Sequence, residues 1–141
     1  MLGSVELRDY MQPLPETATV RADESVFRAI ERIIDKKVSG VLVVDDEKNL
    51  VGILSEIDCL RSVLSSTYNK SGSATVKEYM TPLSALVTAD INDDIVDVAS
   101  DMLKKNHRRR PVLENGKIVG QITCRRILMA MRNFSDDKLA G

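Results

Sequence analysis

The chain has 141 residues, enough for one compact domain or for two small repeats that share a core. Its 43% hydrophobic and 29% charged residues are typical of a soluble globular protein and argue against disorder. The 20 basic and 21 acidic residues nearly cancel, and aromatic residues make up only 4%. The balanced charge argues against general electrostatic attraction to nucleic acid or to an anionic membrane, and the scarce aromatic residues argue against a surface on which bases stack.

Few residues are available for metal or covalent chemistry. Two cysteines, Cys59 and Cys124, and a single histidine, His107, disfavour a disulfide framework, a zinc site and a catalytic triad. Neither a secretory leader nor an apolar run long enough to span a bilayer is apparent. We therefore expect a cytoplasmic protein that does not enter a membrane.

The sequence contains an internal repeat, which is the first feature to look for in a new chain. The motif Tyr10-Met11-x-Pro13-Leu14 recurs as Tyr79-Met80-x-Pro82-Leu83, and Leu50-Val51-Gly52 recurs as Ile118-Val119-Gly120. The match predicts one repeat at residues 7–64 and a second at residues 76–132. The polar, small residues 65–75 are expected to form a linker, and residues 133–141 a flexible tail.

Hydrophobic periodicity orders the elements of the first repeat. After an extended lead-in around Thr19, apolar residues at helical spacing predict a helix over 25–37. The apolar run 41–44 predicts a strand buried on both faces, and 50–54 predicts the returning strand. A second helix is expected from residue 55 to about 64.

The second repeat follows the same order. An extended lead-in around Thr88 precedes a helix over 93–105 and a strand over 111–113. The returning strand is expected at 118–122, and the closing helix from 123 to about 132. Each half is then a helix–strand–strand–helix unit, too small to cover its own sheet, so we expect the two to pack as a pseudo-symmetric pair.

This order and its motifs resemble the cystathionine-β-synthase (CBS) domain, and two copies in register resemble a CBS pair, or Bateman module. The matching segments are the Tyr-Met-x-Pro motifs and residues 38–45, 52–58, 108–114 and 120–126. The resemblance implies an α/β fold of tandem CBS repeats that binds AMP, ADP, ATP or S-adenosylmethionine in the cleft between the repeats. It also implies a homodimer, a regulatory role and no required cofactor.

The strand-to-helix junction of the first repeat carries Ser55 and Asp58. Free backbone N–H groups at a helix start favour an anion, and an ionised aspartate accepts both hydroxyl protons of a ribose. The same Ser-x-x-Asp spacing is also that of a capping box, which needs no ligand. The family resemblance assigns ribose binding to Asp58.

The second repeat departs from this pattern, because Thr123 and Arg126 stand where the first has Ser55 and Asp58. A guanidinium has no acceptor for a ribose hydroxyl and is disfavoured in the first turn of a helix. Two hypotheses remain. Arg126 faces a phosphate, or it is an exposed arginine that fills a vacant pocket.

Other candidate ligand-binding residues come from the strand starts. Arg108 and Arg109 precede the second repeat's strand and suit a phosphate clamp, with a solvated basic edge as the alternative. Gly40 allows a base to approach the strand backbone closely, Val41 is a candidate apolar wall, and Thr19 offers contacts to base or sugar.

The sequence therefore predicts a stand-alone regulatory module that binds an adenosine nucleotide and signals to a separate protein target. The alternative is a ligand-independent dimerisation scaffold that binds an acidic protein or RNA, although nucleic acid is disfavoured. No nucleophile–base pair or glycine-rich phosphate loop is present, so we do not expect an enzyme.

Overall fold

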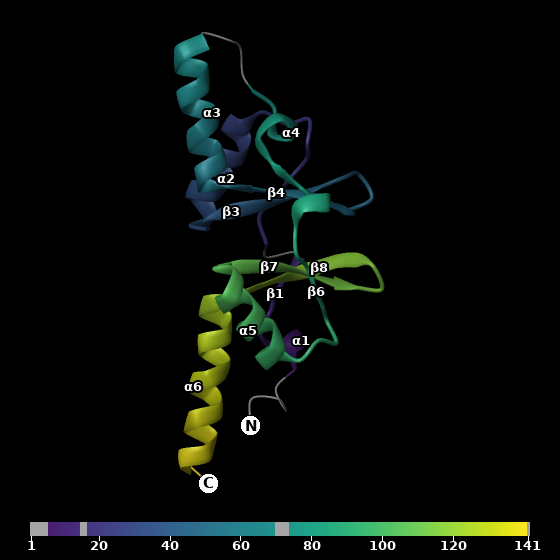
Figure 1. The fold of residues 1–141 in the computed structure, drawn as a ribbon, viewed down its shortest axis with the longest axis vertical. Coiled ribbons are helices and arrows are strands. Elements are labelled where there is room, and N and C mark those ends of the chain that lie inside the picture. Colours follow the sequence, from purple (N-terminus) through teal and green to yellow (C-terminus); the bar gives the residue numbers. More distant parts are fainter. Residues whose placement is uncertain (1–5, 15–16, 70–73, 141) are drawn as a thin grey trace. The chain divides into compact units, whose positions relative to one another are not determined.

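A computed structural model describes the backbone of residues 6–14, 17–69 and 74–140, with side chains described as far as residue 65 and, in the last stretch, residue 133. The chain divides into two compact units. Unit 2 is Thr17–Leu86, and unit 1 combines Met1–Glu16 with Val87–Gly141. Each unit has a four-stranded sheet and two long helices (Figure 1).

Unit 2 has the sheet order β2-β3-β4-β5. Its elements are β2 Thr19–Val20, α2 Val26–Lys36, β3 Gly40–Val44, β4 Leu50–Ser55, α3 Glu56–Asn69, α4 Val76–Tyr79, β5 Thr81–Pro82 and the short 3-10 helix Leu83–Ala85. β2 runs parallel to β3, and the other pairs are antiparallel. The predicted elements of the first repeat are therefore confirmed, and β3 is buried along its whole length.

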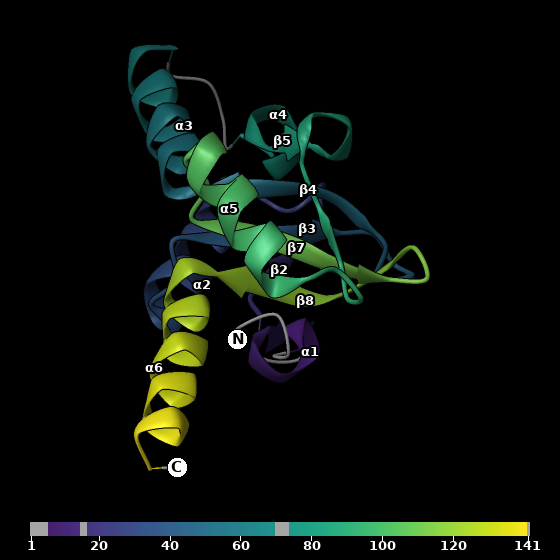
Figure 2. The ribbon, with the colours of Figure 1, turned by 60° about the horizontal axis from the view of Figure 1, so that its bottom comes forward.

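Unit 1 repeats this arrangement with the order β1-β8-β7-β6. Its elements are α1 Leu7–Tyr10, β1 Gln12–Pro13, β6 Ala89–Asp90, α5 Ile95–Lys105, β7 Arg109–Glu114, β8 Lys117–Thr123 and α6 Cys124–Ala140. Helix α6 begins directly after β8 and runs away from the sheet (Figure 2).

The helices begin and end where local chemistry favours it. The Ser25 hydroxyl accepts the Arg28 N–H at the start of α2, and the Asp94 carboxylate accepts two N–H groups at the start of α5. The residue that follows each helix, Lys37 or Asn106, adopts the left-handed conformation and caps its end. Their buried stripes face the sheet and form the core of each unit with β3 and β4, or with β7 and β8.

The compact units do not coincide with the sequence repeats 7–64 and 76–132. Strand β1 from the first repeat pairs with β8 of the second, and β5 from the second pairs with β4 of the first. Each two-residue strand contains a proline and lies at a sheet edge, where its missing N–H costs no ladder bond. Each repeat thus completes the sheet built mainly by the other repeat.

The expected linker and the expected tail are partly helical. The backbone of 133–141, expected to be a flexible tail, is helical as far as Ala140 because α6 continues. The first part of the expected linker 65–75 is also helical, since α3 extends to Asn69. Local polarity suggested a break in both places, but a helix with one packed face tolerates a polar extension.

Candidate functional site

Four elements of unit 2 meet at one end of its sheet. β3 begins at Gly40, directly opposite Ser55, the last residue of β4. The Glu56 N–H donates to the Ser39 carbonyl at 3.1 Å, which holds the start of α3 against the start of β3. Thr19 pairs with β3 two residues further along. We call Thr19, Gly40, Ser55 and Asp58 the unit 2 site.

The Asp58 carboxylate is held in place by the start of its own helix. Its Oδ2 accepts the Ser55 N–H at 3.0 Å, while the Ser55 hydroxyl accepts the Asp58 N–H at 3.2 Å. The capping box expected from the spacing is therefore present. Oδ1 accepts a bond from Arg61 at 3.3 Å, and this arginine side chain is 63% exposed.

Capping leaves Asp58 with spare hydrogen-bonding capacity. An ionised carboxylate has about four acceptor positions, and two partners occupy one on each oxygen. Asp58 is 7% exposed, so a bond to its remaining acceptors is made in a partly desolvated place and is correspondingly strong. The capping interpretation and the ribose-binding interpretation are compatible.

The backbone of Thr19 is held by an arginine of an ion pair that the sequence did not reveal. Arg32 on α2 donates to the Thr19 carbonyl at 2.9 Å and binds both oxygens of Glu24 at 2.9 Å. The Arg32 hydrogen bonds hold the pKa of Glu24 below its ordinary value, against a smaller opposing effect of burial. Glu24 and Arg32 therefore position the strand that carries Thr19.

This ion pair predicts a loss of stability in acid. Because the folded-state pKa of Glu24 is depressed, its stabilisation is present above the unfolded pKa of about 4.5 and is lost as the pH falls through the folded value. We expect the free energy of unfolding to fall less steeply below pH 4.5 in Glu24→Gln than in the wild type. Urea unfolding at a series of pH values measures this, with Glu31→Gln as the control, and equal acid slopes would contradict it.

The Val41 side chain does not line the unit 2 site. It is 1% exposed and belongs to the core of unit 2, packed among residues of α2, β3 and β4. Every residue of β3 is buried, so both faces of this strand are covered and the Val41 side chain, which faces the core, is not exposed at the site.

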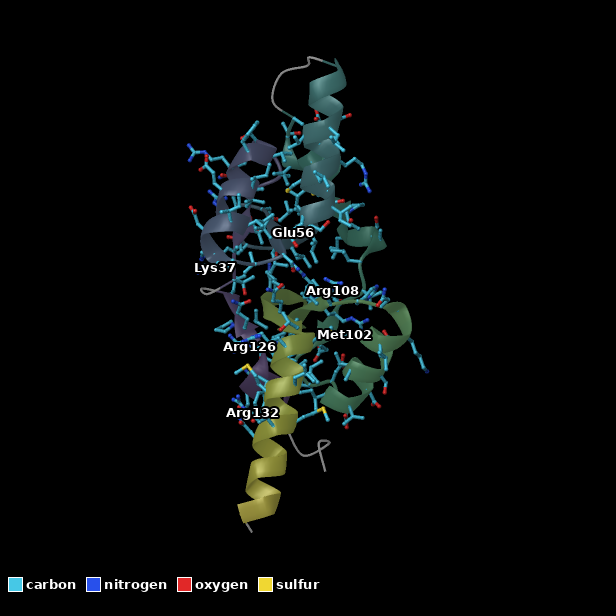
Figure 3. The ribbon with its side chains drawn as sticks, turned by 90° about the vertical axis from the view of Figure 1, so that its left-hand side faces the viewer. Lys37, Glu56, Met102, Arg108, Arg126 and Arg132 are labelled. Atoms are coloured by element: carbon cyan, nitrogen blue, oxygen red, sulfur yellow. The ribbon has the colours of Figure 1, made fainter. Side chains whose placement is uncertain are left out.

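Unit 1 repeats the geometry with different chemistry. Arg109 lies opposite Thr123, and the Cys124 N–H donates to the Arg108 carbonyl at 3.0 Å, as Glu56 does to Ser39. The Thr123 hydroxyl accepts the Arg126 N–H at 3.1 Å. We call Arg108, Arg109, Thr123 and Arg126 the unit 1 site. Figure 3 shows Arg108 where β7 begins and Arg126 in the first part of α6.

Charge distinguishes the two sites. Where unit 2 has the acceptor Asp58, unit 1 has the half-buried donor Arg126. Within the described residues, Arg108, Arg125 and Arg126 make no ion pair with an acid, while Arg109 does have a partner. The unit 1 site therefore offers donors and positive charge but no carboxylate for a ribose.

Arg110 is the charged residue of this region that the sequence did not single out. It is 3% exposed, pairs with Asp101 on α5 at 2.9 Å and contacts the His107 ring at 3.1 Å. Arg108, by contrast, precedes β7, which begins at Arg109, and is exposed. Arg110 ties β7 to α5 and is not free for a ligand.

The described residues show little sign of metal or thiol chemistry. Within 6–14, 17–69 and 74–140, no group of three or more His, Cys, Asp or Glu side chains is placed to hold a metal ion. Burial raises the pKa of the Cys59 thiol to about 11, which disfavours its reactive thiolate. In the same part of the chain, no helix is both long and apolar enough to cross a membrane.

The fold and the paired strand-to-helix sites define a tandem α/β module of two related units. The family model of the CBS domain matches residues 7–65 and again residues 76–133. The chain therefore belongs to the CBS-domain family and carries a CBS pair, as the sequence resemblance indicated.

Several relatives share this architecture. The chain is 30% identical over 151 residues to CBSX2, a chloroplastic CBS domain-containing protein of Arabidopsis thaliana, and 30% identical over 105 residues to the uncharacterized protein MJ1225 of Methanocaldococcus jannaschii. These matches cover 86% and 74% of this chain but only 61% and 36% of the relatives. The inosine-5'-monophosphate dehydrogenase of Aquifex aeolicus is 34% identical over 78% of this chain, which is 21% of that enzyme.

A solved structure gives the same picture. The crystal structure of CBSX2 in complex with AMP superposes with a TM-score of 0.81 at 28% identity, over 92% of this chain and 98% of that chain. The α/β fold with tandem CBS repeats is thus confirmed.

Proposed function

We propose that this protein is a regulatory module that binds an adenosine nucleotide of the AMP class through the unit 2 site and signals to a separate protein. The observation that carries the proposal is Asp58, a nearly buried carboxylate at a helix start with acceptor capacity to spare. Two ribose hydroxyls need two acceptors in one place, and an ionised aspartate supplies them. The AMP complex of the related CBSX2 supports the choice of ligand class.

The difference between the two sites supports one ribose-binding site per chain. Thr123 reproduces the capping bond of Ser55, but Arg126 removes the acceptor that Asp58 provides. Arg108 and Arg126 make no ion pair with any described residue and suit an anion, so the unit 1 site contributes phosphate contacts or stays free of nucleoside. Two equivalent nucleoside sites are not compatible with this chemistry.

Calorimetry with AMP tests both statements. We expect about one AMP bound per chain, and roughly 100-fold weaker binding of the 2′,3′-dideoxy analogue, because two hydrogen bonds to a charged group are lost. Two equivalent sites, or equal affinity for the dideoxy analogue, would contradict the proposed role of the unit 2 site.

A thermal-shift series with AMP, ADP, ATP and S-adenosylmethionine identifies the preferred ligand, because a compound that binds the folded state raises the unfolding midpoint.

We also propose that the protein self-associates as a homodimer. Large apolar side chains stay exposed on the long helices of both units, among them Ile34 at 67%, Leu60 at 59% and Leu103 at 84%. This many large apolar side chains left exposed on helices favour an interaction surface. Sedimentation velocity over a range of concentrations tests this, and a monomer at every concentration would contradict it.

A further inference from the structure

A groove of about 580 Å³ lies on unit 2, at the end of the sheet opposite the unit 2 site. β3 begins at Gly40 in that site and ends at Val44 in the groove, roughly 13 Å further along an extended strand. In Figure 1 the start of α3 lies at the left end of this sheet and the turn between β3 and β4 at the right end. The residues that line the groove all belong to unit 2, and we call it the unit 2 groove.

The floor of the unit 2 groove is apolar. It includes Ala22, Val51 and Met80, which are partly buried and pack against the core of unit 2. Val44 also lines the groove and is 8% exposed. Pockets that hold small molecules have volumes of about 300–1,000 Å³ and are mostly apolar, with a few polar groups that orient the ligand. The floor therefore suits the apolar part of a small ligand.

The rim of the groove carries opposite charges on different elements. Lys77 on α4 makes no ion pair with any described residue. The turn after β3 contributes Asp45 and Asp46, and the Asp45 carboxylate is held in place by two backbone N–H groups of the turn, at 2.8 and 2.9 Å. A single arginine, Arg21, pairs with Asp46 at 2.7 Å and with Asp23 at 3.7 Å. The turn side therefore stays acidic, and the α4 side offers an ammonium group.

Unit 1 shows what fills the floor at the corresponding place. In the repeat alignment, Ile91 and Leu113 stand where unit 2 has Ala22 and Val44. Both replacements are larger, and Ile91 is 4% exposed as part of the core of unit 1. The floor of the unit 2 groove is thus open because two of its side chains are small.

The rim differs between the units in the same direction. Arg8 and Glu114 of unit 1 match Lys77 and Asp45 of unit 2, and the unit 1 side chains pair with each other at 2.6 Å. Lysine is shorter than arginine and aspartate is shorter than glutamate, and no ion pair joins the two residues in unit 2. Unit 2 therefore has two separated opposite charges above an unfilled apolar floor.

We propose that the unit 2 groove binds a free α-amino acid with an apolar side chain, such as leucine. The ligand carboxylate accepts hydrogen bonds from Lys77, and the ligand ammonium donates to the acidic turn at Asp45 and Asp46. The apolar side chain packs on Val51 and Met80. The zwitterion thus bridges the two charges that meet directly in unit 1. A carboxylate alone leaves the acidic turn opposed to an anion, and an amine alone is repelled by Lys77, so charge complementarity selects the ligand that has both groups. This inference does not rest on nucleotide binding at the unit 2 site.

An NMR titration of the methyl groups with L-leucine tests the proposal. We expect saturable shifts of the Val44, Val51 and Met80 methyl signals. L-Alanine lacks most of the apolar side chain and is expected to bind roughly 10- to 50-fold more weakly. Isocaproate is leucine without the ammonium, and isopentylamine is leucine without the carboxylate. Each is expected to bind roughly tenfold more weakly than leucine or worse. No saturable shift with leucine, or equal affinity for either analogue, would overturn the proposal.

Two variants test the floor and the rim separately. Ala22→Ile/Val44→Leu gives the floor the residues of unit 1, and we expect leucine affinity to fall at least about tenfold in a variant that thermal unfolding shows to be folded. Lys77→Gln is expected to weaken leucine about tenfold without weakening isopentylamine, because the amine loses only a repulsion. Lys36→Gln, an exposed lysine of α2 outside the groove, is the matched control and should change neither affinity.

The outcomes separate this proposal from the nucleotide site. Leucine affinity that is unchanged in both groove variants would overturn an amino-acid site in the unit 2 groove. AMP calorimetry on the same samples reports on the unit 2 site alone, since none of the substituted residues belongs to it. We expect AMP binding to be the same in all of them, and a loss of AMP affinity in step with leucine affinity would show that the groove is not a separate site.

Discussion

Asp58→Ala is expected to weaken AMP binding by at least about 100-fold while the protein stays folded. The two hydrogen bonds from ribose hydroxyls to the carboxylate contribute about 1.5–3 kcal/mol each, and alanine removes both. The substitution also removes the acceptor for the Ser55 N–H, so we expect a loss of about 1 kcal/mol in the free energy of unfolding. Calorimetry with AMP measures the first effect and urea unfolding the second.

The chain offers a matched control for the loss of the cap. Glu78 accepts the Thr75 N–H at 3.3 Å in the capping box of α4, which is also in unit 2 and is not one of the unit 2 site residues. Glu78→Ala therefore removes the same kind of capping bond, and we expect a similar cost in stability with unchanged AMP binding. If both variants lose AMP to the same extent, the effect belongs to folding and Asp58 is not the ribose anchor.

Gly120→Ala is expected to lower the free energy of unfolding by about 3 kcal/mol, near the upper end for overpacking. A Cβ at this position would lie 2.1 Å from the Gln12 carbonyl oxygen and 3.1 Å from the Pro13 Cα. These are backbone atoms of β1, so no flexible side chain can move aside. Relief of the clash requires β1 to separate from β8, which also strains the 2.9 Å bond between the Gln121 and Gln12 side chains.

Gly116 provides the comparison. It lies in the turn between β7 and β8 with φ of +79°, and a Cβ there would meet nothing within 4 Å. Gly116→Asn keeps a residue that tolerates positive φ, so we expect a change of only a few tenths of a kcal/mol in urea unfolding. A Gly120→Ala variant as stable as Gly116→Asn would show that β1 is not anchored in unit 1.

Much of the fold was predictable because it rests on local signals. The helices at 25–37 and 93–105 show an apolar stripe of helical period, and the structure ends them at Lys36 and Lys105. The strand pair of each repeat was equally clear, since a short apolar run followed by a turn and a second run is typical of a hairpin. Errors lie at the edges, where α3 and α6 run on through polar residues.

The site was predictable in part. The spacing of Ser55 and Asp58 predicted a cap, which is present, and the family resemblance assigned ribose binding to Asp58. Sequence could not find Arg32 or Arg110, because the partners Thr19 and Asp101 are brought to them only by packing between a helix and a strand. Ribose binding by Asp58 and phosphate binding by Arg108 and Arg126 stay predictions.

The sequence by itself determined that the chain is a tandem repeat of α/β units and that the second copy has lost the acidic residue of the first. Both follow from residue identity and period, which need no three-dimensional partner. Only the tertiary structure decided that β1 and β5 each complete the other repeat's sheet. Two-residue strands carry too little periodicity to reveal a pairing partner, and the partner lies more than 25 residues away along the chain. Each short strand pairs with the unpaired N–H and C=O groups at the edge of a sheet, and that edge exists only once the sheet has formed.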